Sequence, residues 1–375
     1  MKTYLDKNVY EAALERIAYC FQEFDNVLVA FSGGKDSGVL LNLCYNYADE
    51  HGLLDKLTMY HLDYEAQYQM TTEYVTRTFL EQFPGIRKMW YCVPIKAQSA
   101  CALGEPYWTP WDAAKKKLWV RAMPENPYVV HEGNLDVPFR HGMVDYEFQD
   151  KLSRHFAKKR GTTAVMVGLR ADESLNRYAA VARGKKRRSY EGRKWITQTS
   201  AVTANVYPLY DWRVSDIWTA TARFGFDYNR LYDLLYQAGL TAGQMRVASP
   251  FNDCAQESLK LYKVIDPSNW ARMIGRVNGV NFTGLYGGTT AMGWKTIKLP
   301  PGHTWKSYYE FLLSTMDART AAHYNNILEK SKRYWMQGGT VDPGTADEVL
   351  AAYPLAAVTG KSGRYDGRDI VQFMG

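Results

Sequence analysis

The sequence predicts an α/β fold, a doubly wound parallel sheet of five strands followed by a mainly helical C-terminal extension. Short apolar runs rich in β-forming residues alternate with segments whose apolar residues recur at helical spacing. The runs are continuous rather than alternating, which is typical of strands that are buried on both faces of a parallel sheet. Beyond about residue 240 the sequence shows only helical patterns. We therefore expect a layered first domain and a helical second region.

The first predicted strand covers residues 26–31, and the two glycines after it lead into a predicted helix over residues 37–47. The same strand-then-helix pattern recurs along the chain. The other predicted strands are residues 57–62, 88–93, 164–168 and 204–207. The other predicted helices of this domain are residues 71–83, 145–159, 214–224 and 229–237. Right-handed crossovers between the strands would place these helices on both faces of the sheet.

An aromatic insertion interrupts the alternation over residues 94–140. It is rich in Pro and Trp, which predicts an irregular segment packed by large aromatic side chains. The predicted domains follow from this layout. Residues 1–240 form the sheet domain with its insertion, and residues 241–375 form the helical region, with helices expected over residues 305–313 and 319–336.

Composition excludes several classes of protein. The 375 residues are 46% hydrophobic and 14% aromatic, which is enough apolar surface for a folded chain. No apolar run reaches the roughly 18–20 residues that span a bilayer, and the N-terminus lacks the apolar segment of a signal peptide, so we expect a cytoplasmic protein without membrane contact. The formal net charge of +7 permits an anionic substrate without requiring nucleic acid. The 5 Cys lack zinc-binding spacing, so we expect no structural metal, no disulfide framework and mostly core thiols.

The strongest motif is the segment SGGKDS at residues 32–37, between the first predicted strand and its helix. Two adjacent glycines let the backbone turn tightly and direct successive N–H groups toward an anion, and the helix N-terminus adds its partial positive charge. The segment is not a Walker A loop, because Val29 stands where that motif requires its first glycine and Asp36 follows Lys35. We call residues 32–37 the phosphate loop and expect them to bind phosphate.

A second polar segment, residues 168–174 (GLRADES), follows the fourth predicted strand. Ligands of doubly wound sheets bind at the carboxyl ends of the strands, near the topological switch point, so this segment should face the phosphate loop. Gly168 would let a nucleotide approach the backbone. The planar guanidinium of Arg170 suits phosphate or sulfate oxygens, and an ion pair with Asp172 or Glu173 is its structural alternative.

Two carboxylates near the same edge have alternative roles. Asp63, directly after the second predicted strand, could meet a ribose or a magnesium-bound water, or could cap a turn. Asp36, inside the phosphate loop, could help to hold Mg²⁺, which prefers carboxylate, water and phosphate oxygens. The seven His have no motif partner, and we interpret them as structural.

Residues 183–194 (RGKKRRSYEGRK) form a basic segment without helical or strand periodicity, which predicts a loop. A phosphate-handling loop, a solvated surface loop and a nucleic-acid surface are its three interpretations. Its position after residues 168–174 favours the first.

The phosphate loop resembles the SGGxDS loop of the PP-loop ATP pyrophosphatase superfamily. Three further segments resemble, in the same order, the branch that contains phosphoadenosine phosphosulfate (PAPS) reductase and the small subunit of ATP sulfurylase. They are residues 168–174, residues 207–212 (YPLYDW) with 216–218 (DIW), and residues 228–239. The similarity covers roughly residues 20–240. Residues 63–68 (DYEAQY), with residues 276–279 (RVNG), resemble a bacterial and phage-borne subgroup that is often named PAPS reductase and linked to a ParB-like partner.

This resemblance implies an enzyme of the ATP pyrophosphatase or nucleotidyltransferase type that binds ATP and Mg²⁺ in an adenine nucleotide α-hydrolase-like domain. It implies catalytic roles for Lys35, Asp36 and Arg170, with Asp36 also the candidate ligand of Mg²⁺. The implied nucleotide-binding residues are Ala30, Phe31, Ser32, Gly33, Gly34, Ser37, Leu62, Asp63 and Gly168. The implied residues for binding an anionic substrate are Glu173, Ser174, Arg183, Lys185, Lys186, Arg187 and Arg188.

The favoured reaction is cleavage of ATP between the α and β phosphates, with transfer of AMP to an anionic acceptor and release of pyrophosphate. PAPS reductases supply a thiol from a C-terminal segment of the Glu-Cys-Gly-Leu-His type, and this chain has none. Its late cysteine, Cys254, lacks the neighbouring Gly and His, so thiol-dependent reduction of PAPS is kept as an alternative. A regulatory nucleotide-binding protein that acts with a ParB-like partner, or with nucleic acid, is a second alternative.

Overall fold

The computed structural model describes residues 6–102, 105–182, 189–247, 249–256, 258–287, 289 and 299–337. The chain divides into two compact units. The first holds Met1–Ala100, Tyr107–Ala255 and Leu261–Asn278, and the second holds Cys101–Pro106, Gln256–Lys260 and Gly279–Gly375. The domain boundary that we expect at residue 240 was drawn from sequence pattern and stays a prediction.

The first unit is built on a sheet that has eight strands in the described residues, three more than the sequence predicted. The strand order is β6-β3-β2-β1-β7-β10-β9-β8. The strands are β1 (Asn26–Ala30), β2 (Leu57–Leu62), β3 (Arg87–Cys92), β6 (Val129–His131), β7 (Thr163–Val167), β8 (Ser189–Tyr190), β9 (Arg193–Gln198) and β10 (Thr203–Val206). Pairing is parallel from β6 to β10 and antiparallel for β9 and β8. The five predicted strands are β1, β2, β3, β7 and β10, so the parallel core is confirmed.

The strands that we did not predict lie at the two edges of the sheet. β6 comes from the aromatic insertion and pairs with β3 over three residues, which is too short a run to show periodicity. In β9 only Ile196 is buried, and the sequence of this strand, which begins with Arg193 and Lys194, shows no alternation of apolar and polar residues. The prediction of a loop is therefore wrong for residues 189–190 and 193–194 of the basic segment, which form β8 and the start of β9, while residues 191–192 form the turn between them. Residues 183–188 lie outside the described residues.

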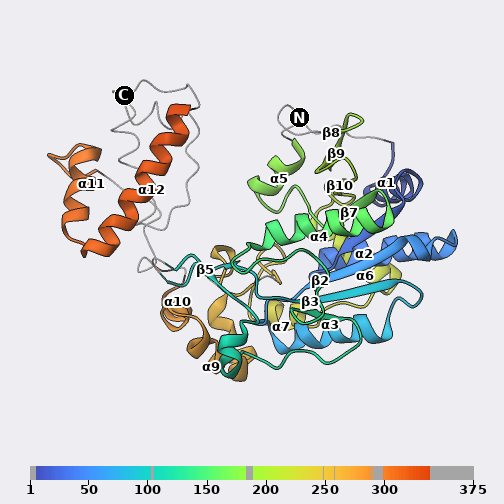
Figure 1. Cartoon of the computed structure of the whole chain (residues 1–375), viewed down its shortest axis with the longest axis horizontal. Helices are drawn as coiled ribbons and strands as arrows, with labels where there is room; N and C mark the ends of the chain where they lie inside the picture. Colours follow the sequence, from blue (N-terminus) through green and yellow to red (C-terminus); the bar gives the residue numbers. More distant parts are fainter. Residues whose placement is uncertain are drawn as a thin grey trace. The chain divides into compact units, whose positions relative to one another are not determined.

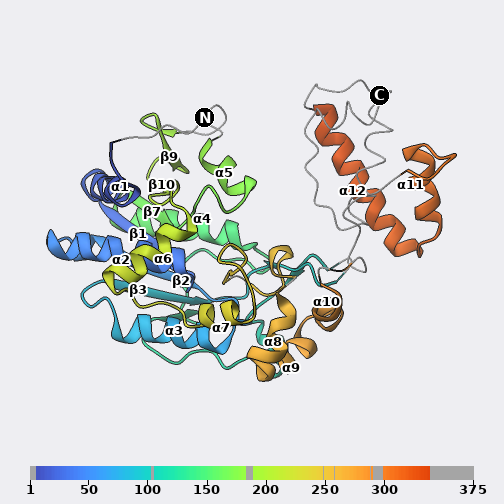
Figure 2. The same ribbon diagram turned by 180° about the vertical axis from the view of Figure 1, so that it is seen from behind.

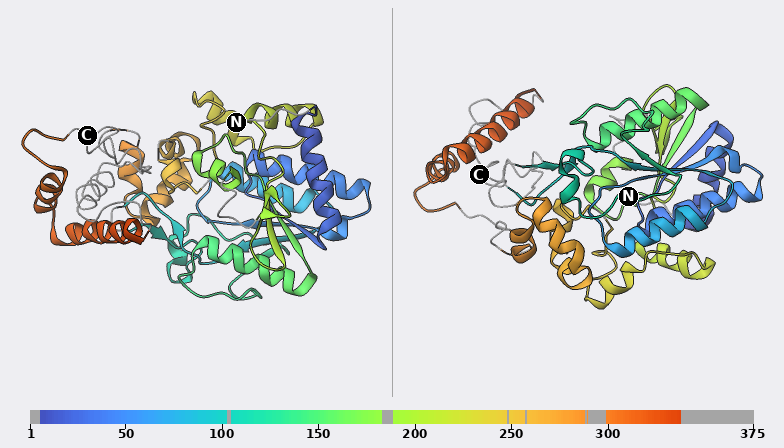
Figure 3. Two further views of the ribbon diagram at one scale, coloured as in Figure 1. Left: turned by 90° about the horizontal axis from the view of Figure 1, so that it is seen from above. Right: turned by 60° about the horizontal axis from the view of Figure 1, so that its bottom comes forward.

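Helices cover both faces of the sheet (Figure 1). One face carries α1 (Val9–Glu23), α2 (Lys35–Glu50), α3 (Gln69–Glu81) and α6 (Val214–Phe224), and the other carries α4 (Asp145–Arg160). Successive residues of β1 show the two layers, because Val27 and Val29 pack into the core on the first face and Leu28 into the core on the second. Figure 2 shows α6 and α3 from behind, and the right view of Figure 3 shows the strands between α3 and α4.

Further helices and strands complete the two units. In the first unit they are α5 (Leu175–Ala182), α7 (Leu231–Gln237), α8 (Tyr262–Ile265), α9 (Pro267–Arg276) and the antiparallel pair β4 (Ala97–Gln98) and β5 (Tyr107–Trp108). In the second unit they are α10 (Val280–Tyr286), α11 (Trp305–Ser314) and α12 (Ala318–Gln337), so the two helices predicted there are confirmed. Among the described residues, no helix combines the length and the apolar character needed to cross a bilayer.

One buried carboxylate anchors the aromatic insertion. The Glu65 carboxylate accepts hydrogen bonds from the backbone N–H groups of Trp111 at 2.7 Å and Val120 at 2.9 Å. It also forms an ion pair with Arg276 at the end of α9, with 2.8 Å between Oε1 and Nε and side chains that are 0% and 2% exposed. Glu65 and Trp111 have left-handed φ values of 65° and 54°, so this junction is strained backbone held by its contacts. Glu65 and Arg276, which stand in the two segments that the resemblance linked, are thus in direct contact.

Candidate functional site

The phosphate loop connects β1 directly to α2. Gly33 has φ +76°, and a Cβ there would lie 2.9 Å from Cγ2 of Val75, so only glycine fits without strain. Gly34 is the N-cap of α2 and has no side chain to occupy the N–H groups of the first helical turn. A helix of 16 residues therefore directs the N–H groups of its first turn and its positive dipole end toward the loop. The geometry fits the anion cradle that the motif predicts.

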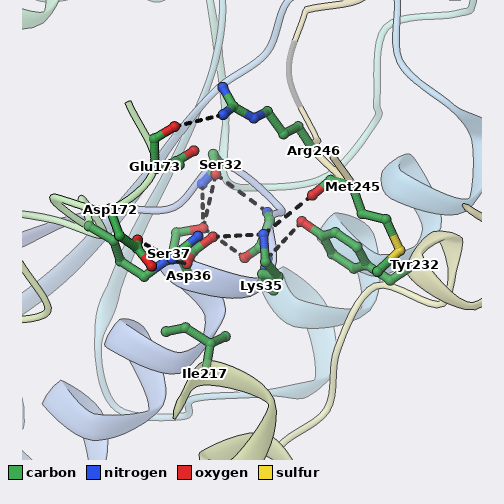
Figure 4. Close-up of polar contacts among 12 residues, drawn as sticks. Ser32, Lys35, Asp36, Ser37, Asp172, Glu173, Ile217, Tyr232, Met245 and Arg246 are labelled. Carbon is green, nitrogen blue, oxygen red and sulfur yellow. Dashed lines mark hydrogen bonds and ion pairs between the residues drawn. The ribbon is translucent and has the colours of Figure 1, made fainter. Parts of the chain in front are cut away.

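Hydroxyl groups fix the shape of the loop (Figure 4). The Oγ atoms of Ser32 and Ser37 lie 3.0 Å apart, and Ser37 Oγ also donates to the carbonyl oxygen of Gly34 at 3.0 Å. The hydroxyl oxygen of Tyr232, on α7, accepts from the backbone N–H of Lys35 at 3.1 Å. Burial raises the pKa of Tyr232, so this phenol stays protonated. Sequence reasoning did not name Tyr232 as a site residue, although it stands in the segment 228–239 on which the resemblance partly rested.

The three predicted catalytic side chains form one chain of ion pairs. Lys35 Nζ lies 3.1 Å from Oδ2 of Asp36, and Oδ1 of Asp36 accepts a hydrogen bond from Nε of Arg170. Arg170 also pairs with Asp172, with 2.6 Å between Nη1 and Oδ1. The side chains of Lys35 and Arg170 are only 4% and 3% exposed. Arg170 therefore contacts Asp36 in the phosphate loop, and it also forms the ion pair with Asp172 that was its structural alternative.

Gly168 lets the segment after β7 lie directly against the phosphate loop. A Cβ on Gly168 would lie 2.9 Å from the carbonyl carbon of Asp36 and from the backbone nitrogen of Ser37. These are backbone atoms, so they cannot rotate out of the way as a side chain would. The two segments therefore face one another, as predicted. The absence of a side chain at Gly168 permits this close approach.

Gly168→Ala should lower the free energy of unfolding by about 1–3 kcal/mol, because the added methyl group displaces the loop. Urea denaturation measures this loss. Gly243→Ala is the matched control, since Gly243 has no left-handed φ and nothing within 4 Å of the added carbon. An equal stability of the Gly168→Ala and Gly243→Ala proteins would contradict the tight junction.

A pocket of about 70 Å³ lies between these elements. Its lining residues are Ser32, Gly34, Lys35, Asp36, Ser37, Gly168, Glu173, Arg177, Tyr232, Arg246 and Val247. Three of these side chains are cationic, namely Lys35, Arg177 and Arg246. Arg177 Nε pairs with the carboxylate of Glu173 at 3.0 Å, and Arg246 Nη2 donates to the carbonyl oxygen of Glu173 at 2.9 Å. The carboxylates of Asp36 and Glu173 also line the pocket, so cations exceed carboxylates by one, and this net positive charge beside a helix N-terminus suits a phosphate chain.

Sequence reasoning missed Arg177 and Arg246. Arg177 had a usable signal, because it follows Glu173 by four residues at the start of a helix. Arg246 had none, since it stands 73 residues from its partner Glu173 in a segment without a motif. Only the tertiary structure brings it to the pocket.

The other predicted site residues that the structure describes make mainly structural contacts. The carboxylate of Glu173 is paired with Arg177, and the hydroxyl oxygen of Ser174 accepts from the N–H of Arg177 at 3.2 Å, which caps α5. Ala30 and Leu62 end β1 and β2, and the ring of Phe31 is buried in the core. The five basic residues Arg183, Lys185, Lys186, Arg187 and Arg188 lie outside the described residues. Their roles in binding stay predictions.

Asp63 is completely buried and already has several donors. Its carboxylate accepts from Trp90 Nε1 at 2.7 Å, from the backbone N–H of Glu65 at 2.8 Å and from Nη2 of Arg121 at 2.6 Å. Burial alone would raise the pKa of Asp63, but the charge and hydrogen bond of Arg121, the charge of His61 and the N–H of Glu65 together outweigh it, so the pKa is lowered. The turn-capping alternative is therefore present, through the N–H of Glu65. A ligand could reach this carboxylate only if Arg121 moved, and the ribose or magnesium role stays a prediction.

Magnesium has one suitable protein ligand at the pocket. Mg²⁺ is usually bound through one or two carboxylates, substrate phosphates and several waters. The carboxylate of Asp36 lines the pocket and is 15% exposed, so it fits as the protein ligand of an ion that enters with a phosphate chain. Within the described residues no three or more His, Cys, Asp or Glu side chains are grouped to hold a metal.

Comparison with known proteins identifies the family of the chain. Residues 26–238 match the family model described as the phosphoadenosine phosphosulfate reductase domain. The chain belongs to this family. Residues 239–375 match a second model, described as a domain of unknown function (DUF3440). The chain is also 34% identical over 353 residues to the uncharacterized protein YbdN of Escherichia coli (strain K12). The aligned region covers 93% of this chain and 85% of the relative.

Two solved structures resemble the PAPS reductase-domain chain weakly. The PAPS reductase of Candida auris, in a phosphate complex, is 12% identical, with 66% of this chain and 97% of that chain covered and a TM-score of 0.35. The FMN adenylyltransferase of Candida glabrata, in complex with FAD and inorganic pyrophosphate, is 14% identical, with 62% and 63% covered and a TM-score of 0.35. The family match confirms the relationship that the phosphate loop predicted.

Proposed function

We propose that the protein is an ATP-binding enzyme that cleaves ATP between the α and β phosphates and transfers AMP to an anionic acceptor. The observation that carries this proposal is the convergence of the α2 N-terminus with the side chains of Lys35, Arg177 and Arg246 on one small pocket. A pyrophosphate group carries several negative charges and many acceptor oxygens, so this pocket is complementary to it. Membership of the PAPS reductase domain family supports a nucleotide as the ligand.

The reaction needs no redox partner. An ionised oxygen of the acceptor forms a bond with the α phosphorus while the bond from that phosphorus to the α–β bridging oxygen breaks, and pyrophosphate leaves with the electron pair. Lys35 and the first N–H groups of α2 would hold the departing pyrophosphate, and Arg177 and Arg246 would stabilise the charge that develops on it. Asp36 would be the protein ligand of Mg²⁺, and the ion would further neutralise the charge of the phosphates. An acceptor that is already ionised requires no general base.

Labelled ATP tests the proposal. The purified protein is incubated with Mg-ATP and sulfate or another oxyanion, with ³²P in either the α or the γ position, and the products are separated by chromatography. We expect the γ label in pyrophosphate and the α label in AMP or its acceptor ester. Release of the γ label as orthophosphate would contradict the proposed bond cleavage.

One observation keeps thiol-dependent reduction of PAPS as a second candidate. Cys254 is the exposed cysteine among those described, and the other four are buried. Burial and then Asp253 raise the pKa of its thiol, while the pocket residues Arg246 and Arg177 act against this rise. The thiol is therefore within electrostatic range of the pocket. Its raised pKa nevertheless leaves little thiolate at neutral pH, which weakens it as a nucleophile.

Cys254→Ser should leave the release of AMP and pyrophosphate unchanged, because the proposed transfer uses no enzyme thiol. The same two proteins are assayed for sulfite release from PAPS with reduced thioredoxin. Sulfite release by the original protein that disappears in the Cys254→Ser variant would establish the reductase instead.

A further inference from the structure

A larger cavity lies within the first unit, at the carboxyl ends of β3 and β6. Its volume is about 870 Å³, and it is lined mainly by the aromatic insertion, with Cys92 from β3, His131 from β6 and Arg272 from α9. We call it the insertion cavity. It shares no lining residue with the pocket at the phosphate loop. In the sheet, β2 stands between β3 and β1, so the two sites belong to different strand ends.

Positive charge dominates the wall of the insertion cavity. Lys116 and Lys117, on the 3₁₀ helix Ala113–Leu118, and Arg272 are exposed lining residues. In the part of the chain that the structure describes, none of these three forms an ion pair with a carboxylate. The fourth cation, Arg121, already neutralises Asp63.

Two carboxylates also line the cavity. Glu132 lies 2.6 Å from Nε2 of His141, and Glu125 forms no ion pair within the described residues. Three unpaired cations thus face one unpaired carboxylate, and the balance favours an anionic ligand. Opposite charges at the rim also make the wall unsuitable for tracking a long polyanion, because Glu125 and Glu132 would repel its backbone.

Indole rings form a second feature of the cavity. Trp111 and Trp119 pack edge to face, with ring centroids 5.2 Å apart and an interplanar angle of 87°. The ammonium of Lys116 lies 5.8 Å from the centroid of Trp119, so a cation and an aromatic surface are adjacent. A ligand with a planar ring would stack on this aromatic surface while its anionic group contacts the ammonium groups of Lys116 and Lys117. The volume lies within the roughly 300–1,000 Å³ that is usual for small organic ligands.

From this arrangement we propose that the insertion cavity is a binding site for a small organic anion that carries a planar ring. An anion without a ring would contact only the cationic side chains of the lining, and an uncharged ring would contact only the indole rings. The site is separate from the phosphate loop, and its occupancy does not require the proposed reaction.

The test uses p-nitrophenyl sulfate, which has both features, beside inorganic sulfate and the uncharged p-nitroanisole. Calorimetry on the full-length protein should show saturable binding of p-nitrophenyl sulfate, at least about tenfold tighter than either comparison compound. The triple variant Lys116→Met, Lys117→Met, Arg272→Met should bind it about fivefold to tenfold more weakly. Lys115→Met is the matched control, because Lys115 is an exposed neighbour on the same 3₁₀ helix that does not line the cavity.

Each alternative has its own signature. ATP affinity should be the same in the triple variant and the control, which separates this site from the phosphate loop and verifies the fold. Absence of saturable binding, or equal binding by the triple variant, would overturn the proposal. Competition between p-nitrophenyl sulfate and ATP would place the probe at the phosphate loop and would also overturn it. Binding of a single-stranded oligonucleotide that depends on the same three residues, without binding of the probe, would make the wall a nucleic-acid surface instead.

Discussion

Lys35→Met should weaken ATP binding by about 100-fold while the protein stays folded. The ammonium of Lys35 lines the pocket with only 4% of its side chain exposed, so it would meet phosphate oxygens with little competition from water. Met has a similar length and fills the same space without the charge. Asp36 keeps Arg170 as its partner, so the change leaves no isolated buried charge. Calorimetry with Mg-ATP measures affinity, and thermal unfolding checks the fold.

Lys151→Met is the control for this change. The side chain of Lys151, on α4, is 40% exposed and pairs only weakly with Glu147, at 3.7 Å, so its removal should alter neither ATP affinity nor stability. A folded Lys35→Met protein with unchanged ATP affinity would remove the phosphate loop from nucleotide binding. Asp36→Ala is a poorer test, because it would leave the nearly buried Arg170 with Asp172 alone.

The parts of the fold that sequence predicted are those with a strong local signal. β1, β2 and β7 are mostly apolar runs because both of their faces are covered: β2 is buried along its whole length, and β1 and β7 are buried except at their last residue. β6 has three residues and β8 has two, so neither can show a periodic pattern. β9 lies next to the edge strand β8 and buries only Ile196, so its other positions can carry polar and charged side chains, and composition alone made it resemble a loop.

The site divides in the same way. The phosphate loop is contiguous, and its glycines and its place before a helix are visible in the sequence. Contacts made by residues far apart are not. The carboxylate of Asp63 pairs with Arg121, which stands 58 residues later in the sequence. The hydroxyl oxygen of Tyr232 accepts a hydrogen bond from the backbone N–H of Lys35, which stands 197 residues earlier. No residue pattern reports such distances, so sequence reasoning assigned Asp63 to a ligand without seeing the ion pair that occupies it.

The contact between Glu65 and Arg276 joins residues that are 211 positions apart, and it leads to the second large effect. Glu65→Gln should lower the free energy of unfolding by about 3–5 kcal/mol. The change removes the negative charge that is paired with Arg276, whose side chain is 2% exposed, and leaves a buried guanidinium without compensation. Part of the bonding to the N–H groups of Trp111 and Val120 would remain through the amide oxygen. The predicted loss therefore comes mainly from the unpaired charge.

Urea denaturation of four proteins separates this charge effect from a general disturbance. Arg276→Met alone should also destabilise, but the double variant Glu65→Gln, Arg276→Met should lose less than the sum of the two single changes, because neither charge is then left alone. Asp150→Asn, which breaks the exposed ion pair with Arg154, is the control and should cost less than about 1 kcal/mol. Additive losses in the cycle would mean that Glu65 and Arg276 act independently, and the anchoring of the aromatic insertion would then have to come from its backbone hydrogen bonds alone.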